Sequence, residues 1–134
     1  MRQPASMTPD KFRTPSAGLE DAIAHCQLHC RTCELLCEST LAQDVTYIAP
    51  GTQPYEQHQL ALVTCAAVCR LAIAALGERH DIRYMCAWCM DVCQQAAAAV
   101  RAVGGPAEVG AACSDCAAAC YLVLSELDAM SSRG

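Results

Sequence analysis

The chain has 134 residues, which is long enough for one domain and short for two. Aromatic residues make up only 4% of it, whereas alanine, leucine and cysteine dominate, and this composition favours helices over sheets. The formal net charge is -5 and the chain has no basic run, which excludes the electrostatic footprint of a nucleic-acid-binding protein.

Residues 1–17 are polar and rich in proline, serine and threonine, and we expect them to form a flexible N-terminal arm. They lack the apolar stretch of a signal peptide, so we place the protein in the cytoplasm. Charged residues interrupt the long apolar segments that follow, so we expect no membrane-spanning helix. Because the cytosol keeps thiols reduced, the 12 cysteines predict metal binding rather than a disulfide scaffold.

Four segments with a helical period follow the arm, and turn signals separate them. Pro54 and Pro106 suit the first turns of the second and fourth segments, and Gly77 suits the end of the second. We expect helices over residues 18–42, 54–76, 81–103 and 106–130. Their lengths and short connections predict an all-α fold, an antiparallel up-down-up-down four-helix bundle about 35 Å long. This metal-binding domain would comprise residues 18–131.

Cysteines repeat at helical spacing within each of these segments. The run "HCQLHCRTCELLC", residues 25–37, holds four of them at intervals of four, three and four residues. At about 100° per residue, these four fall within about 60° of one another, and the later segments carry similar stripes. Each stripe takes the place of the inward leucines of an ordinary bundle helix. Counting residues from the turns places the four stripes side by side, in a band about 16 Å long along the bundle axis. We therefore expect a core lined with sulfur.

The cysteines are therefore the candidate metal ligands. They are Cys26, Cys30, Cys33, Cys37, Cys65, Cys69, Cys86, Cys89, Cys93, Cys113, Cys116 and Cys120.

Simple packing, disulfide bonds, and zinc or iron motifs fit the spacing of the cysteines less well. A core that needs only volume would mix leucine and valine into the stripes, and neighbours on one helix are poorly placed for disulfides. Zinc sites usually have four ligands at turns, whereas the C-x-x-C pairs here are predicted in mid-helix. The spacings of ferredoxins and of c-type haem attachment are absent from the sequence.

Cu(I) suits a tube of thiolates best. It is a soft ion that accepts two thiolates in a near-linear arrangement, so each sulfur can bridge two ions. The predicted capacity is then on the order of one ion per thiolate, about a dozen. Without metal the buried groups must be neutral thiols, so uptake should release protons.

The segments "CQLHCRTCELLC", "CAAVCRLA", "CAWCMDVC" and "CSDCAAAC" resemble the cysteine-rich four-helix-bundle copper storage proteins, specifically their cytosolic branch without an export signal. The likeness covers about residues 20–127. It implies a homotetramer of bundles, each storing many Cu(I) ions along its core, without catalytic turnover.

The chain departs from this family at two sets of positions. Family members often carry histidines just ahead of the helix-four cysteines, where this chain has Val109 and Gly105. They also carry further cysteines on the same faces, and their replacement here implies a reduced capacity. The replacing residues are Leu62, Ala72, Ile82, Ala96, Val100, Val123 and Leu127.

The two ends of the predicted tube differ. One end of the bundle lies opposite the loop of residues 43–52. There the inward stripe continues as apolar residues, so this end should be sealed. These are Leu19, Ala22, Leu76, Ile82 and Leu127. At the loop end, His58 lies seven residues before Cys65 and within about 20° of its stripe, so we predict that it is a metal ligand at the mouth. Thr40 and Asp44 extend the first stripe toward this mouth.

Two histidines and two aromatic residues lie off the stripes. His29 is about 60° and His25 about 100° from the helix-one stripe, so we expect them to face a neighbouring helix or solvent. Tyr84 and Trp88 lie opposite the helix-three cysteines, where they could form a subunit interface or an exposed aromatic pair.

The leading functional hypothesis is storage or sequestration of multiple Cu(I) ions in the cytosol by a homo-oligomer, with copper ions as the partner and neither nucleic acid nor membrane. We expect no enzyme activity, since none of the cysteines has the helix N-terminal placement of a thiol-disulfide enzyme. The alternative is an electron-transfer or sensor bundle that holds an iron-sulfur or mixed metal cluster. A structural helical protein with incidental cysteines would bind no metal tightly.

Overall fold

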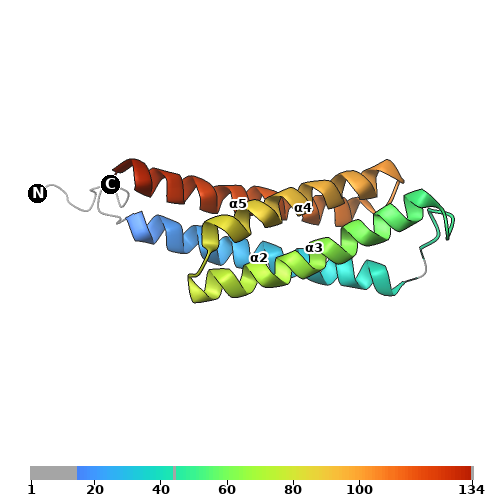
Figure 1. Ribbon diagram of the computed structural model, residues 1–134, viewed down its shortest axis with the longest axis horizontal. Helices are drawn as coiled ribbons and strands as arrows, with labels where there is room; N and C mark the ends of the chain where they lie inside the picture. The colour runs from blue at the N-terminus through green and yellow to red at the C-terminus, as the bar shows by residue number, and fades with distance from the viewer. Residues whose placement is uncertain (1–14, 44, 134) are drawn as a thin grey trace, which may run out of the picture.

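The computed structural model of the chain describes residues 15–43 and 45–133 and confirms the predicted all-α bundle (Figure 1). The helices are α2 (Pro15–Ala42), α3 (Gln53–Glu78), α4 (Ile82–Ala102) and α5 (Ala107–Arg133). Helix α2 thus includes residues 15–17 of the segment expected as an arm, and residues 1–14 lie outside the described part.

The four helices run up and down in antiparallel order. Helix α2 packs against α3 and α5, and α4 packs against the same two helices. In Figure 1 the start of α2, the α3–α4 turn and the end of α5 lie toward one end of the bundle, and we call this the proximal end. The α2–α3 loop and the α4–α5 turn lie at the other, distal end.

The start of α3 follows the chemistry of its first residues. The Thr52 side-chain hydroxyl accepts a hydrogen bond of 3.3 Å from the Tyr55 backbone N–H and so caps the helix. Pro54 lies in the first turn, where its missing N–H has no cost, and Glu56 lies near the positive end of the helix dipole.

The end of α3 differs from the prediction. The helix does not stop at Gly77 but continues to Glu78, and Arg79 takes the left-handed conformation, with φ 59° and ψ 40°. The Arg79 guanidinium bonds the Leu76 carbonyl and forms an ion pair with Glu20 of α2. These side-chain interactions hold a non-glycine residue in a conformation that glycine usually supplies.

Ion pairs join neighbouring helices on the outside of the bundle. Arg70 of α3 donates from Nε to Glu34 of α2 at 2.9 Å and also pairs with Glu38. Arg83 of α4 donates to Asp128 of α5 at 2.7 Å. Most of these side chains are exposed, so each pair adds only a small contribution to the packing of the helices.

Apolar side chains close the core at both ends. Leu76 is fully buried at the proximal end, and the other residues predicted to seal it are partly buried and packed against the core. At the distal end Leu62, Val100 and Val109 are buried. Apolar side chains thus cap the central band of cysteines at its proximal and distal ends.

Helices α3 and α5 are, by length and hydropathy alone, apolar enough to cross a membrane, over Gln53–Glu78 and Ala107–Ser132. In α3 the expected interruption is a single charged residue between Leu60 and Gly77, Arg70, and the helix passes this test despite it. In each helix 44% of the apolar window is buried inside the bundle. Core helices of globular proteins pass the same test.

Candidate metal centre

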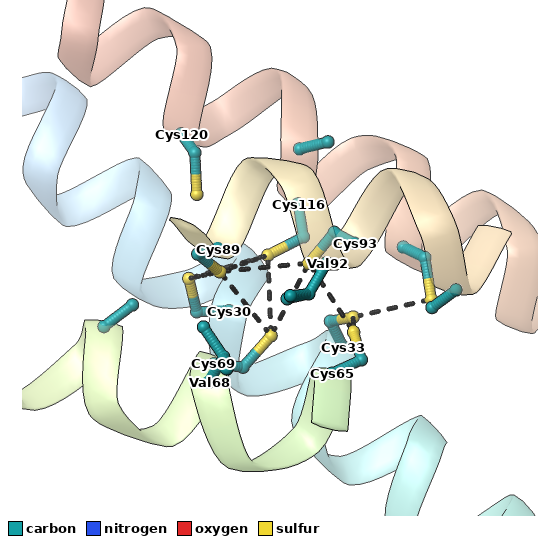
Figure 2. Packing of buried hydrophobic residues seen from close by; sticks show 14 of the residues in the cluster. Cys30, Cys33, Cys65, Val68, Cys69, Cys89, Val92, Cys93, Cys116 and Cys120 are labelled. Carbon is teal, nitrogen blue, oxygen red and sulfur yellow. Dashed lines mark hydrogen bonds between the residues drawn. The ribbon is translucent and has the colours of Figure 1, made fainter. Parts of the chain in front are cut away.

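All twelve cysteines predicted as ligands lie in the core of the bundle. Each of their thiols is free, and each side chain has 0% of its surface exposed. All four helices contribute cysteines to the same central stretch of the bundle. Figure 2 shows the labelled sulfurs pointing toward one another between the helices. The structure therefore confirms that the sulfur atoms converge on the long axis of the bundle.

Neighbouring sulfur atoms are in van der Waals or hydrogen-bond contact. The shortest separations are 3.5 Å, between Cys33 and Cys65 and between Cys116 and Cys30. A disulfide bond would require about 2.05 Å. The thiols of diagonally opposed helices also meet, since Cys69 of α3 lies 3.8 Å from Cys116 of α5. Sulfur thus fills the centre of the bundle from all four sides.

The sulfurs form five groups, four of four atoms and one of three, in which all atoms lie within 4.8 Å of one another. From the proximal to the distal end, these groups are Cys26–Cys86–Cys120, Cys30–Cys89–Cys116–Cys120, Cys69–Cys89–Cys93–Cys116, Cys33–Cys65–Cys69–Cys93 and Cys33–Cys37–Cys65–Cys113. All twelve cysteines belong to at least one group.

Each group shares sulfur atoms with the next. The shared residues are, in the same order, Cys120, then Cys89 and Cys116, then Cys69 and Cys93, then Cys33 and Cys65. The groups therefore form one continuous chain along the bundle axis rather than separate sites. An ion bound in one group would share its ligands with an ion bound in the next.

The separations between sulfurs suit metal coordination. With a metal–sulfur bond of about 2.3 Å, ligand sulfurs lie about 3.8 Å apart in a tetrahedral site and about 4.0 Å apart in a trigonal one. The sulfur contacts across the core, such as 3.6 Å between Cys65 and Cys93 and 3.9 Å between Cys30 and Cys89, are close to these values. Near-linear coordination requires about 4.6 Å, so it would need the sulfurs to separate slightly.

Hydrogen bonds among the thiols shift their pKa values in opposite directions. Hydrogen bonds from neighbours, that of Cys116 foremost, lower the pKa of the Cys30 thiol to about 3. The hydrogen bond with Cys116, followed by further thiol contacts and burial, raises the pKa of Cys69, and the same is true of Cys120. A buried sulfur can hold negative charge only where neighbouring thiols donate to it. Full ionisation of the core therefore requires positive ions within it.

His58, the predicted mouth ligand, is buried at the distal end with 1% of its surface exposed. Its Nδ1–H donates to Gln59 Oε1 at 2.8 Å, so its Nε2 accepts the hydrogen bond of 2.9 Å from the Tyr47 hydroxyl. His58 belongs to none of the five sulfur groups found in the described residues. Its part in metal binding stays a prediction, and sequence reasoning missed its partner Tyr47.

Of the two other residues predicted near the mouth, the structure describes one. Thr40 is buried, but its hydroxyl donates to the Leu36 carbonyl of its own helix at 2.8 Å. Asp44 lies outside the described residues.

The side chains predicted to lie off the stripes do lie off them. The rings of His25 and His29 contact each other on the outer side of α2, with centroids 4.4 Å apart. Tyr84 and Trp88 form a tilted pair on α4 with centroids 6.1 Å apart, and both are exposed.

Comparison of the chain with models of protein families, with curated proteins and with solved structures found no match. The chemistry of the site itself is therefore the basis for a functional proposal. The site is a buried set of overlapping cysteine clusters suited to binding metal ions.

Proposed function

We propose that the protein stores or sequesters multiple Cu(I) ions in the cytosol, bound by the twelve core thiolates. The observation that carries this proposal is the continuous chain of five overlapping sulfur groups. Thiolates are soft ligands that favour soft ions, and a sulfur that belongs to two groups can bridge two ions. A chain of bridging sulfurs can hold a string of ions at a capacity far above that of a single structural site.

Zinc would use this arrangement poorly. A structural zinc ion usually has four ligands in a tetrahedral arrangement. At most two of the four-sulfur groups share no sulfur with each other, for example the two that contain Cys30 and Cys37. Two zinc ions bound there would leave Cys26, Cys69, Cys86 and Cys93 without a complete site. Cu(I), which needs fewer ligands per ion, uses all twelve.

An iron-sulfur cluster also fits the core less well than Cu(I). Such a cluster places iron and sulfide atoms between its cysteine ligands. The Cys33 and Cys65 sulfurs are 3.5 Å apart, and the Cys69 and Cys93 sulfurs 3.8 Å apart, which leaves no room for that inorganic core between them. A single metal ion needs less space than a cluster.

Storage explains the burial better than catalysis does. A thiol-disulfide enzyme needs an accessible thiolate, whereas every cysteine here is fully buried. Buried thiolates shield Cu(I) from water and from other thiols and limit its exchange. We therefore propose a non-catalytic role in the reducing cytosol, where twelve free thiols persist.

Copper would load through the distal end, past His58. This histidine lies on the inward stripe of α3 seven residues from Cys65, with the buried Leu62 between them. Turning Tyr47 away would free Nε2 of His58, a suitable ligand for a passing copper ion. A homo-oligomer, a tetramer by resemblance to the copper storage proteins, is part of this proposal, with the exposed pair Tyr84 and Trp88 as a candidate contact.

Metal analysis of protein produced in cells tests this proposal. The untagged protein is purified anaerobically from cells grown with added copper, zinc or iron, and its metal content per chain and visible spectrum are measured. We expect several copper ions per chain, little zinc or iron, and no visible absorption, because Cu(I) thiolates are colourless. About two zinc ions per chain, or iron with visible bands, would contradict copper storage.

A further inference from the structure

We propose that His25 and His29 form a second metal site, on the outer surface of α2, which binds a divalent transition-metal ion such as Ni²⁺, Zn²⁺ or Cu²⁺ through two imidazole nitrogens. This site is separate from the sulfur core, and it binds ions that are harder Lewis acids than Cu(I). The proposal does not depend on the identity of the metal in the core.

The geometry of the pair carries the proposal. His25 and His29 are four residues apart, so their side chains lie one above the other on the same face of α2, with Cβ atoms about 6 Å apart. Their rings already meet, with centroids 4.4 Å apart and an interplanar angle of 63°. His25 is exposed and His29 is half-buried, so a solvated ion can reach both rings.

This spacing is the one by which helices chelate metals. In the H-E-x-x-H motif, two histidines four residues apart on one helical face bind a single zinc ion. The segment His25-Cys26-Gln27-Leu28-His29 repeats the histidine spacing. Imidazole suits zinc, copper and nickel, at metal–nitrogen distances of about 2.0–2.1 Å for zinc. A small rotation of each ring would turn one nitrogen of each toward a shared ion.

The core cysteines cannot supply further ligands to this site. Cys26 and Cys30 directly follow the two histidines in the sequence, yet both side chains point inward and are fully buried. Two imidazoles fill only part of a divalent ion's coordination shell, so water or a donor group of another molecule completes it. Such a site exchanges its ion readily, in contrast to the closed core.

The remaining histidines provide controls within the same molecule. The chain has four histidines in all, and each lies in the part that the structure describes. His58 is buried, and both of its ring nitrogens are hydrogen-bonded. The His80 side chain is 78% exposed, but the neighbouring Asp81 is its partner, at 3.3 Å, rather than a second imidazole. Of these four, His25 and His29 are the two that combine access to solvent with a paired imidazole.

Retention on immobilised Ni²⁺ tests the site directly. An ion fixed to a solid matrix cannot reach the buried thiols, so the full-length, untagged protein can bind only through its surface. We expect the wild type to be retained and to elute with imidazole. His25→Ala and His29→Ala should each reduce retention strongly, because a chelate is lost, whereas His80→Ala should behave as the wild type.

Three outcomes would overturn the assignment: no retention of the wild type, unchanged retention of His25→Ala/His29→Ala, or loss of retention in His80→Ala alone. A second readout in solution is the histidine ring NMR signals upon anaerobic addition of substoichiometric Ni²⁺. Selective broadening of His25 and His29 supports the site, and broadening of His58 or His80 alone contradicts it. The Cu(I) capacity of His29→Ala, expected to equal that of the wild type, separates this site from the core.

Discussion

The Tyr47 hydroxyl donates a hydrogen bond of 2.9 Å to Nε2 of the buried His58, and the two rings meet edge to face with centroids 5.4 Å apart. This contact joins the α2–α3 loop to the inward face of α3 at the distal end of the sulfur core. Nε2 of His58 is therefore occupied by a residue of a loop, and under the proposed loading route this hydrogen bond must break before Nε2 can receive a copper ion.

Removal of the Tyr47 hydroxyl should speed loading. Tyr47→Phe keeps the ring but frees Nε2 of His58, so we expect Cu(I) to transfer several-fold faster from a coloured chelator complex, at unchanged final capacity. His58→Ala should slow the same transfer, also at unchanged capacity. Tyr121→Phe, at an exposed tyrosine of α5, is the matched control. Loading rates for His58→Ala equal to the wild type would rule out a role for this histidine.

Loss of a sulfur shared by two groups should reduce the copper capacity more than loss of a sulfur that belongs only to the terminal group. Cys69 belongs to two groups and lies 3.8–3.9 Å from Cys89, Cys93 and Cys116, whereas Cys86 belongs only to the terminal group of three. We expect Cys86→Ala to lose about one Cu(I) and Cys69→Ala about two or more, since each bridging sulfur serves two ions.

An anaerobic titration against a competing chelator measures both capacities. The side chains of Cys69 and Cys86 are equally buried, so the two substitutions leave comparable cavities. Circular dichroism of each variant checks that the helices persist. Equal losses of copper would indicate separate sites instead of a chain.

Copper affinity should increase with pH. Hydrogen bonding, that of Cys116 foremost, and burial raise the pKa of Cys69 and of Cys120, so these thiols keep their protons near neutral pH in the metal-free protein. Bound Cu(I) requires thiolates, so it displaces these protons, and apparent affinity should change by about tenfold per pH unit for each proton released. Competition titrations from about pH 6 to about pH 8 measure the slope. A flat profile would contradict protonated thiols in the empty core.

Substitution of Gly105 should destabilise the distal end. A methyl group there would lie 2.8 Å from Val100 Cγ1 and 3.1 Å from Tyr47 Cε1, so Val100 must shift and the Tyr47 ring must also move slightly. We expect Gly105→Ala to lower the free energy of unfolding by about 1–3 kcal/mol. The control is Gly110→Ala in α5, where the nearest atom is Arg101 Cγ at 3.8 Å, and it should gain up to about 1 kcal/mol from helix propensity. Urea unfolding of the reduced, metal-free variants measures both free energies of unfolding. Equal values for the two variants would show that the α4–α5 turn accommodates the methyl group without loss of stability.

The fold and the sulfur core were predictable from the sequence because one local pattern specifies both. The intervals of four, three and four residues between Cys26, Cys30, Cys33 and Cys37 define a helix and at the same time its inward face. Short turns then bring such faces to one height, and in the structure Cys86 of α4 and Cys120 of α5 belong to one group.

The features that were missed depend on contacts between residues far apart in the chain. At the end of α3, Arg79 binds the nearby Leu76 carbonyl and also Glu20, 59 residues away, and no local signal marks the second contact. The partner of His58 comes from a loop whose path has no periodic pattern. The 3.5–4.0 Å spacing of the sulfurs depends on how closely the helices pack, so the coordination number could not be derived from the positions of the cysteines alone.

The most direct test is an anaerobic titration of the reduced, full-length protein with Cu(I) in competition with a chromogenic chelator, with thiols counted before and after. We expect twelve reactive thiols in the unfolded, metal-free chain. We also expect tight binding of about a dozen Cu(I) ions per chain, after which the thiols no longer react. Binding of only one or two ions, or fewer free thiols because some are oxidised in pairs, would contradict a copper-storing sulfur core.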